Sequence, residues 1–344
     1  MNVLFIGLGG IGQRHLRVFK KLYPLSRVYA IRSSNNNNEI TDSLNLDKSV
    51  DIEEKYRITR CNDINEATRF NIDFAIVSNP TSLHLDTSID LINNKIPVLV
   101  EKPISDKKNI EKLIQCSKTK KIPFKVGYMM RFHPCFNKLR DLLESDIIGK
   151  IYNINVNVNS YFPSWHKYEK YNELYAGRRE LGGGVVLTEI HEIDLLFSLF
   201  GLPEYLFAVG GTRSNLEIDV EDNVSALFKF NKENYEFSSA LNMSFVQKTP
   251  YRKMHILGEH GDILWDITEN KISMNNYTEG NKYSESFKDF QRNDLFEAQL
   301  ISFINFIKNK NENQMNQSFE ESIGSHKIAM AIKESLTSNS IVHF

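Results

Sequence analysis

The stretch "FIGLGGIGQRH", residues 5–15, decides the fold. It follows the apolar run Asn2 to Ile6 and opens an amphipathic segment, with glycines in the spacing G-x-G-x-x-G. In a strand-turn-helix unit the first glycine permits a tight turn, the second lets the main chain approach a pyrophosphate, and the third allows close packing. The N–H groups and dipole of the helix N-terminus favour phosphate. The residues expected to bind a dinucleotide at this turn are Gly7, Gly9, Gly10, Ile11 and Gly12.

Strands and helices alternate outward from this turn to about residue 125. Further apolar strands are predicted at 27–31, 74–77, 97–100 and 124–127, with helices between them. Alternation at this spacing predicts an α/β fold with a doubly wound parallel sheet over residues 1–125.

The period of the pattern changes at residue 151. In "IYNINVNVNSY" (151–161) apolar residues alternate with asparagines, and 224–230 and 237–245 alternate likewise. Such a period of two indicates strands with one buried and one wet face. Residues 126–344 are therefore expected to form a second domain on a long, mostly antiparallel sheet. Two last helices, near 291–309 and 318–337, are expected to pack back on the first domain.

The amino-acid composition argues against a protein that binds nucleic acid or a membrane. The 344 residues carry a net charge of −1, so no basic field points to nucleic acid or to an anionic membrane surface. The sequence contains no run of 18 apolar residues, so no transmembrane helix is predicted. The amino terminus lacks the pattern of a signal peptide. Three widely spaced cysteines fit a reducing compartment. We expect a cytoplasmic protein that binds neither nucleic acid nor membrane.

The end of the second strand predicts which dinucleotide binds. An NAD-selective site usually places an acidic residue about 20 positions past the last glycine, but this chain has Arg32 followed by Ser33. A guanidinium can bind a 2′-phosphate in a bidentate fork. This favours NADP(H). If Arg32 only stacks on the adenine, NAD(H) binds as well.

Two more segments end strands at the same edge of the sheet, where α/β proteins bind ligands. "VSNPTSLH" (77–84) places Asn79, Pro80 and His84 there, and His84 could equally be a packing residue. "VLVEKPIS" (98–105) ends a buried strand in Glu101, Lys102 and Pro103, two charges and a ring that cannot continue a central strand.

Taken together, these segments resemble the Gfo/Idh/MocA family of NAD(P)-dependent oxidoreductases. The resemblance extends through "VGYMMRFHP" (126–134), residues 177–201 and "VEDN" (220–223), and members linked to surface-sugar biosynthesis are similar. It implies a Rossmann domain at 1–125 and an α/β domain at 126–344 with a large, open, mostly antiparallel sheet. It also implies a homodimer or homotetramer assembled through that sheet.

The resemblance assigns roles to individual residues. Lys102 is expected to reach the nicotinamide ribose and the substrate oxygen, next to a peptide at Pro103 that could be cis. His191 is expected to be the general acid/base. Asp194, one helical turn on, could orient His191 or cap backbone groups. Many relatives carry an aspartate three or four residues before this histidine, where this chain has Thr188 and Leu187, so either Lys102 and His191 suffice or a carboxylate such as Glu189 substitutes.

Substrate and remaining cofactor contacts are expected around the second domain's first strand. Tyr161 and Trp165 could face a sugar ring, Arg178 could bind a carboxylate or phosphate, and Arg131 could lie near the nicotinamide or form a structural salt bridge. The predicted reaction moves hydride to or from a hydroxyl-bearing carbon of a sugar, nucleotide sugar or polyol, without a metal. The alternatives are a net non-redox reaction through transient oxidation and a non-catalytic dinucleotide-binding regulator.

Overall fold

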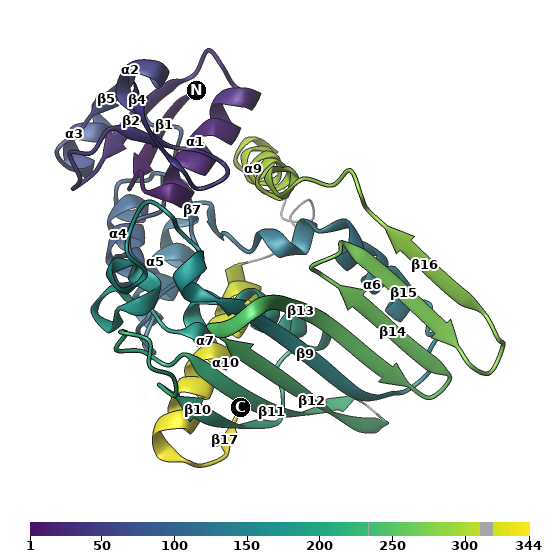
Figure 1. Ribbon diagram of the computed structural model, residues 1–344. Coiled ribbons are helices and arrows are strands. Elements are labelled where there is room, and N and C mark those ends of the chain that lie inside the picture. Colours follow the sequence, from purple (N-terminus) through teal and green to yellow (C-terminus); the bar gives the residue numbers. More distant parts are fainter. Residues whose placement is uncertain (233, 310–318) are drawn as a thin grey trace.

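The first sheet is built from the amino-terminal third of the chain (Figure 1). The computed structural model describes all residues except 233 and 310–318. Six parallel strands lie in the order β5-β2-β1-β6-β7-β8, which confirms the predicted doubly wound sheet. Their bounds are β1 (Asn2–Ile6), β2 (Arg27–Ile31), β5 (Ile58–Arg60), β6 (Phe74–Val77), β7 (Val98–Val100) and β8 (Phe124–Val126).

Helices cover both faces of this sheet because its central strands are apolar on both sides. Leu4, Ile76 and Leu99 are all buried in these strands. The helices of the domain are α1 (Gly10–Leu22), α2 (Ile52–Tyr56), α3 (Ile64–Thr68), α4 (Thr81–Asn93) and α5 (Glu111–Lys120), and a small hairpin joins β3 (Asn38–Ile40) to β4 (Leu46–Asp51).

The second sheet has nine strands in the order β16-β15-β14-β13-β9-β12-β11-β10-β17. Every pair is antiparallel except β9 and β12, so the predicted large, mostly antiparallel sheet is confirmed. The strands are β9 (Ile151–Tyr161), β10 (Tyr205–Gly211), β11 (Asn223–Lys232), β12 (Tyr235–Ser244), β13 (Val246–Gly258), β14 (Gly261–Asp266), β15 (Lys271–Asn276), β16 (Lys282–Ser286) and β17 (Val342–His343).

One face of the second sheet is covered by helices, and this follows from the alternation along its strands. In β9, Ile154, Val156 and Val158 are buried, while the intervening asparagines lie on the other face. The elements of this layer are η1 (Met129–Phe132), α6 (Pro134–Glu144), α7 (Val185–Thr188), α8 (His191–Phe200) and α10 (Phe319–Ser338). Four short 3₁₀ turns lead into α7, namely η2 (Phe162–Ser164), η3 (Tyr171–Glu173), η4 (Tyr175–Gly177) and η5 (Arg179–Leu181).

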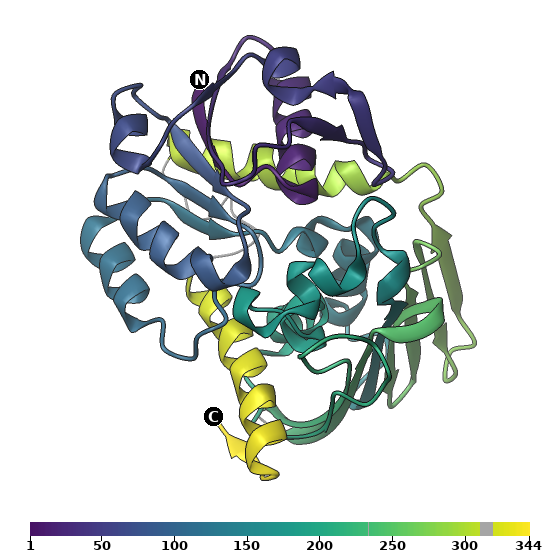
Figure 2. The same ribbon diagram turned by 60° about the vertical axis from the view of Figure 1, so that its left-hand side comes forward.

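Helix α9 (Arg292–Asn309) comes late in the chain but lies against the first domain, beside α1 (Figure 2). The Phe296 ring packs edge-on to His15 of α1 with centroids 5.2 Å apart, and Phe303 packs on Phe74 at 5.7 Å. The two domains therefore share a core. Among the described residues, no helix is long and apolar enough to cross a membrane.

Candidate active site

The glycine turn between β1 and α1 is built tightly on one side and open on the other. Gly7 has φ +90°, and a Cβ there would lie 2.8 Å from the Asn79 nitrogen; a Cβ at Gly12 would lie 2.5 Å from the Gly7 oxygen. Gly9 is the N-cap of α1, with no side chain capping the helix and nothing within 4 Å of the position of its Cβ. Larger residues at Gly7 and Gly12 would collide with backbone, while the helix N-terminus has room for a phosphate.

His84 supports two loops at this edge from behind. Its Nδ1 lies 2.7 Å from the Pro103 oxygen and its Nε2 lies 2.9 Å from the Asn79 oxygen, and the ring is buried. Pro80 is the N-cap of α4. His84 therefore fixes the loops that carry Asn79 and Lys102, which corresponds to the packing role.

Arg32 lies at the carboxyl end of β2, as predicted, but its guanidinium already has partners. Its Nη1 lies 3.1 Å from Glu53 Oε1 and 3.2 Å from Asn37 Oδ1. Arg60 donates to the same Glu53 oxygen at 2.6 Å. Two guanidinium groups thus share one carboxylate, and Ser33 beside them is exposed.

Lys102 projects from the end of β7 toward α7 of the second domain. Its ammonium donates to the main-chain oxygen of Thr188, and the Lys102–Pro103 peptide is cis. Burial lowers the pKa of Lys102, and the negative charges of Glu189 and Glu101 oppose that shift. Glu101 is itself held by a 2.7 Å hydrogen bond between its Oε1 and Nε2 of His15.

His191 opens α8 three residues after Thr188, and so lies close to Lys102. Burial lowers its pKa well below 6.5, and the positive charges of Lys102 and Arg252 lower it further. Its buried Nδ1 has no hydrogen-bond partner among the described residues. A neutral imidazole with an unpartnered nitrogen can accept a proton.

Thr188 and Asp194 take different places from those expected. The Thr188 hydroxyl is buried without a hydrogen-bond partner among the described residues, while the main-chain oxygen of Thr188 accepts a hydrogen bond from the Lys102 ammonium. Asp194 accepts two 2.8 Å hydrogen bonds from Arg131 and one of 2.7 Å from Ser325. The carboxylate does not contact His191, so the prediction that it orients this residue is corrected.

Arg131 is a buried structural residue. Besides its fork to Asp194 of α8, its Nη1 donates to Glu321 of α10 at 2.7 Å, and it is 2% exposed. It therefore ties η1, α8 and α10 together inside the second domain. Of the two roles predicted for Arg131, the structure shows the salt bridge.

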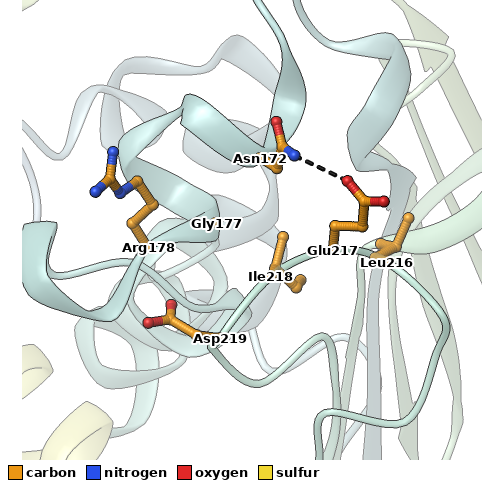
Figure 3. A pocket seen from close by; sticks show the side chains of 7 residues that line it. All are labelled: Asn172, Gly177, Arg178, Leu216, Glu217, Ile218 and Asp219. Atoms are coloured by element: carbon orange, nitrogen blue, oxygen red, sulfur yellow. Dashed lines mark hydrogen bonds between the residues drawn. The ribbon is translucent and has the colours of Figure 1, made fainter.

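The predicted substrate residues are spread along the segment that leads into α7. Trp165 packs between Phe162 and Phe245, with ring centroids 5.0 and 5.3 Å away, and Tyr161 ends β9 half-buried. Arg178 pairs with Glu180. Figure 3 shows Arg178 at the rim of a shallow pocket of about 500 Å³, which contains none of Lys102, Thr188 and His191.

Several residues around Lys102 were missed by sequence reasoning. Arg252 of β13 pairs with Glu192, which is fully buried next to His191, and one Arg252 nitrogen is buried without a partner among the described residues. Arg292 at the start of α9 adds a charge that also lowers the pKa of His191. A carboxylate in the apolar helix "HEIDLLFSLF" signals that a cation must approach it. The sequence does not say which cation.

The site suits a dinucleotide and a small polar substrate. The glycine turn offers a phosphate-sized opening, and Lys102 and His191 converge at the same sheet edge. Within the described ranges, no cluster of three or more His, Cys, Asp or Glu residues could hold a metal ion.

Comparison with known proteins gives relatives along the whole chain. Myo-inositol 2-dehydrogenase of Thermotoga maritima is 25% identical over 329 residues, covering 90% of this chain and 88% of the relative. A 2,7-anhydro-N-acetylneuraminate hydratase of Escherichia coli is 28% identical over 142 residues, covering 41% of this chain and only 37% of the hydratase. The WlbA dehydrogenase of Bordetella pertussis, solved with NADH and UDP-GlcNAcA, superposes with a TM-score of 0.79 at 17% identity, covering 100% of this chain and 97% of that one.

Two family models match separate parts of the sequence. The model of the oxidoreductase family with an NAD-binding Rossmann fold matches residues 1–128, and the model of the GFO/IDH/MocA C-terminal domain matches residues 136–264. Together they account for about three quarters of the chain. The chain therefore belongs to the GFO/IDH/MocA family of oxidoreductases with an NAD-binding Rossmann domain.

Proposed function

We propose that this oxidoreductase transfers hydride between a nicotinamide cofactor and a hydroxyl-bearing carbon of a sugar, nucleotide sugar or polyol. The observation that carries the proposal is the convergence of Lys102 and His191 from different domains at the edge of the sheet that bears the glycine turn. Both positions are costly, because a partly buried lysine and a buried histidine each lose hydration energy.

Each active-site residue has a separate role in the reaction. When bound, the nicotinamide cofactor accepts or donates the hydride. The Lys102 ammonium binds the substrate oxygen and stabilises the negative charge that develops on it. His191, held neutral, accepts the proton of the substrate hydroxyl as the alcohol becomes a carbonyl, and returns it in the reverse direction. Thr188 positions Lys102 through its main-chain oxygen.

The names of the relatives support a sugar-like substrate. The inositol dehydrogenase covers nine tenths of the chain, and its named substrate is a ring polyol. The WlbA structure contains a nucleotide sugar beside NADH. Both ligands carry secondary hydroxyl groups, and Lys102 and His191 could assist the oxidation of such a group by the cofactor.

For the cofactor, we propose a preference for NADP(H) over NAD(H). Arg32 and Arg60 place two guanidinium groups at this strand end, beside the carboxylates of Glu53 and Asp51, and a guanidinium can bind a 2′-phosphate in a bidentate fork. A phosphate must compete with Glu53 for the Arg32 guanidinium. We also propose a homodimer or homotetramer through the second sheet.

A second candidate reaction is supported by one relative. The Escherichia coli protein is named a hydratase, which is a net non-redox activity, and its match covers only 37% of the hydratase. In that case the bound cofactor would oxidise the substrate transiently while Lys102 and His191 handle the charge and the proton, and the hydride would be returned before product release.

The test is a screen of sugars, inositols and nucleotide sugars with both cofactors, followed by absorbance of the reduced nicotinamide. One class of substrate is expected to give turnover, and Lys102→Ala and His191→Ala are each expected to lower kcat by about 10²-fold or more. Lys107→Ala, in the same loop but exposed, is the matched control and should retain activity. Circular dichroism should find all three variants folded.

The outcomes separate the candidates. Near-normal turnover in either active-site variant would remove that residue from the mechanism. Product formed without net change in nicotinamide absorbance would favour transient oxidation. Tight cofactor binding with no turnover of any class would favour a non-catalytic regulator.

A further inference from the structure

A segment of the second domain reaches over the glycine turn of the first. A Cβ added to Gly10, the first residue of α1, would lie 3.0 Å from the Tyr168 hydroxyl oxygen. Further along the same segment, a Cβ added to Gly182 would lie 2.8 Å from Cβ of Thr81, the first residue of α4. The segment thus touches the N-termini of both helices that open at the cofactor edge (teal, beside α4 in Figure 1).

The Tyr168 hydroxyl lies on the side of Gly10 where a pyrophosphate is expected. In a helix the Cα–Cβ bond tilts toward the N-terminus, so an atom near the Gly10 Cβ position lies toward the free N–H groups of the first turn. The position beside it is open, since nothing lies within 4 Å of the Gly9 Cβ position. A phosphate at this turn would therefore have the Tyr168 O–H group at its edge.

Neighbouring side chains hold Tyr168 in this place. Its ring stacks on His166 with centroids 5.1 Å apart and planes 16° from parallel, and His166 Nδ1 lies 2.8 Å from Glu169 Oε1. Trp165 anchors the start of the segment among Phe162 and Phe245. Burial raises the pKa of Tyr168, and the charge of Glu169 and a side-chain hydrogen bond with it add to the shift. The hydroxyl therefore stays protonated, and a pyrophosphate oxygen would replace Glu169 as its acceptor.

We propose that residues 165–169 form a clasp over the bound dinucleotide, in which the Tyr168 hydroxyl donates a hydrogen bond to a pyrophosphate oxygen and slows release of the cofactor. The contact comes from the second domain, so it also couples cofactor binding to the packing of the two domains. This inference rests on dinucleotide binding at the glycine turn. It does not depend on which substrate is oxidised.

The experiment measures dissociation of NADPH and NADH from the full chain by stopped-flow fluorescence. Tyr168→Phe is expected to release both cofactors roughly tenfold faster or more, because a hydrogen bond to a charged group is lost. Tyr171→Phe is the matched control: it lies in the same segment, but its hydroxyl accepts a hydrogen bond from the Glu217 N–H group, so its release rate should match wild type.

A second ligand locates the contact on the cofactor. ADP-ribose keeps the pyrophosphate and lacks the nicotinamide. The Tyr168→Phe substitution should therefore weaken the binding of ADP-ribose by the same factor as the binding of NADH. Unchanged release from Tyr168→Phe, or weakening of NADH alone, would overturn the clasp contact while leaving the proposed reaction intact. If the wild-type chain binds neither dinucleotide, both the clasp and the proposed function fail.

Discussion

Glu189 supplies the carboxylate charge that acts most strongly on Lys102. Among the charges around Lys102 it has the largest effect in raising the pKa, against the lowering caused by burial. It follows Thr188, the residue found where many relatives carry an aspartate. We therefore propose Glu189 as the substitute for that aspartate, acting one position further along the chain.

The Glu189→Gln variant tests this substitution through its pH profile. Glu189 raises the pKa of Lys102, so its removal should lower that pKa, and the protonated lysine should be lost at lower pH. We expect the alkaline limb of the kcat profile to move to lower pH and the maximal kcat to fall roughly tenfold. Glu236→Gln, in an exposed surface pair, is the control. An alkaline limb that stays in place would exclude Glu189 from this role.

The second prediction at the residue scale concerns the effect of Arg32 on cofactor preference. In Arg32→Asp, a negative charge would face the 2′ position and repel a phosphate, while an acidic residue can bond a ribose hydroxyl. The ratio of the Kd values for NADP(H) and NAD(H) should shift toward NAD(H) by about tenfold or more. Titration of both cofactors against wild type, the variant and the exposed control Arg69→Asp measures it. An unchanged ratio would mean that Arg32 does not discriminate.

At the scale of elements, the contact between β8 and α9 contains a buried amine. Lys125, in the middle of β8, is 2% exposed and donates to Ser302 of α9 at 3.0 Å. Burial, together with the charge of Arg131, lowers its pKa to about 7. The folded pKa lies below the unfolded value near 10.5, so above pH 7 the unfolded state binds one more proton. Stability should then rise with pH, by about 1.4 kcal/mol per unit between pH 7.5 and 9.5.

Lys125→Met removes this dependence and tests it. Methionine fills a similar volume without a charge, so the variant should be the more stable protein at pH 7 by about 2–4 kcal/mol, with the difference shrinking as pH rises. Urea unfolding at several pH values measures both free energies. Lys112→Met, on the exposed face of α5, should follow wild type. Parallel pH dependence in wild type and Lys125→Met would contradict the shifted pKa.

The elements were predictable where one short pattern determines them. The glycine turn, the apolar parallel strands and the alternating strand at 151–161 each follow from local spacing, and the structure has them in those places. The Asp194–Arg131 pair was not predictable, because it joins residues 63 positions apart on α8 and η1. The same holds for Tyr168 over Gly10, since only the docking of two domains brings the two together.

At the scale of the whole molecule, the second sheet leaves one broad face without helices (Figure 1). The face opposite the helices carries apolar side chains that are about half exposed, among them Val209 of β10 at 53% and Leu227 of β11 at 58%. Asn153, Asn155 and Asn157 of β9 make the middle of the same face polar. A mixed face of this kind, with apolar contacts beside hydrogen-bonding side chains, is typical of an interface between folded subunits.

We therefore expect a second copy of the chain to cover this face. Light scattering at micromolar concentration should give about two or four times the 39.8 kDa chain mass. Leu227→Glu combined with Val209→Glu places charges in the contact, and should lower the mass to one chain without loss of secondary structure. Leu25→Glu is the control, because Leu25 is 98% exposed on the first domain and a charge there meets only water. A wild-type mass of one chain would show that the outer face of the sheet is solvated, with its asparagines bonded to water in place of a partner.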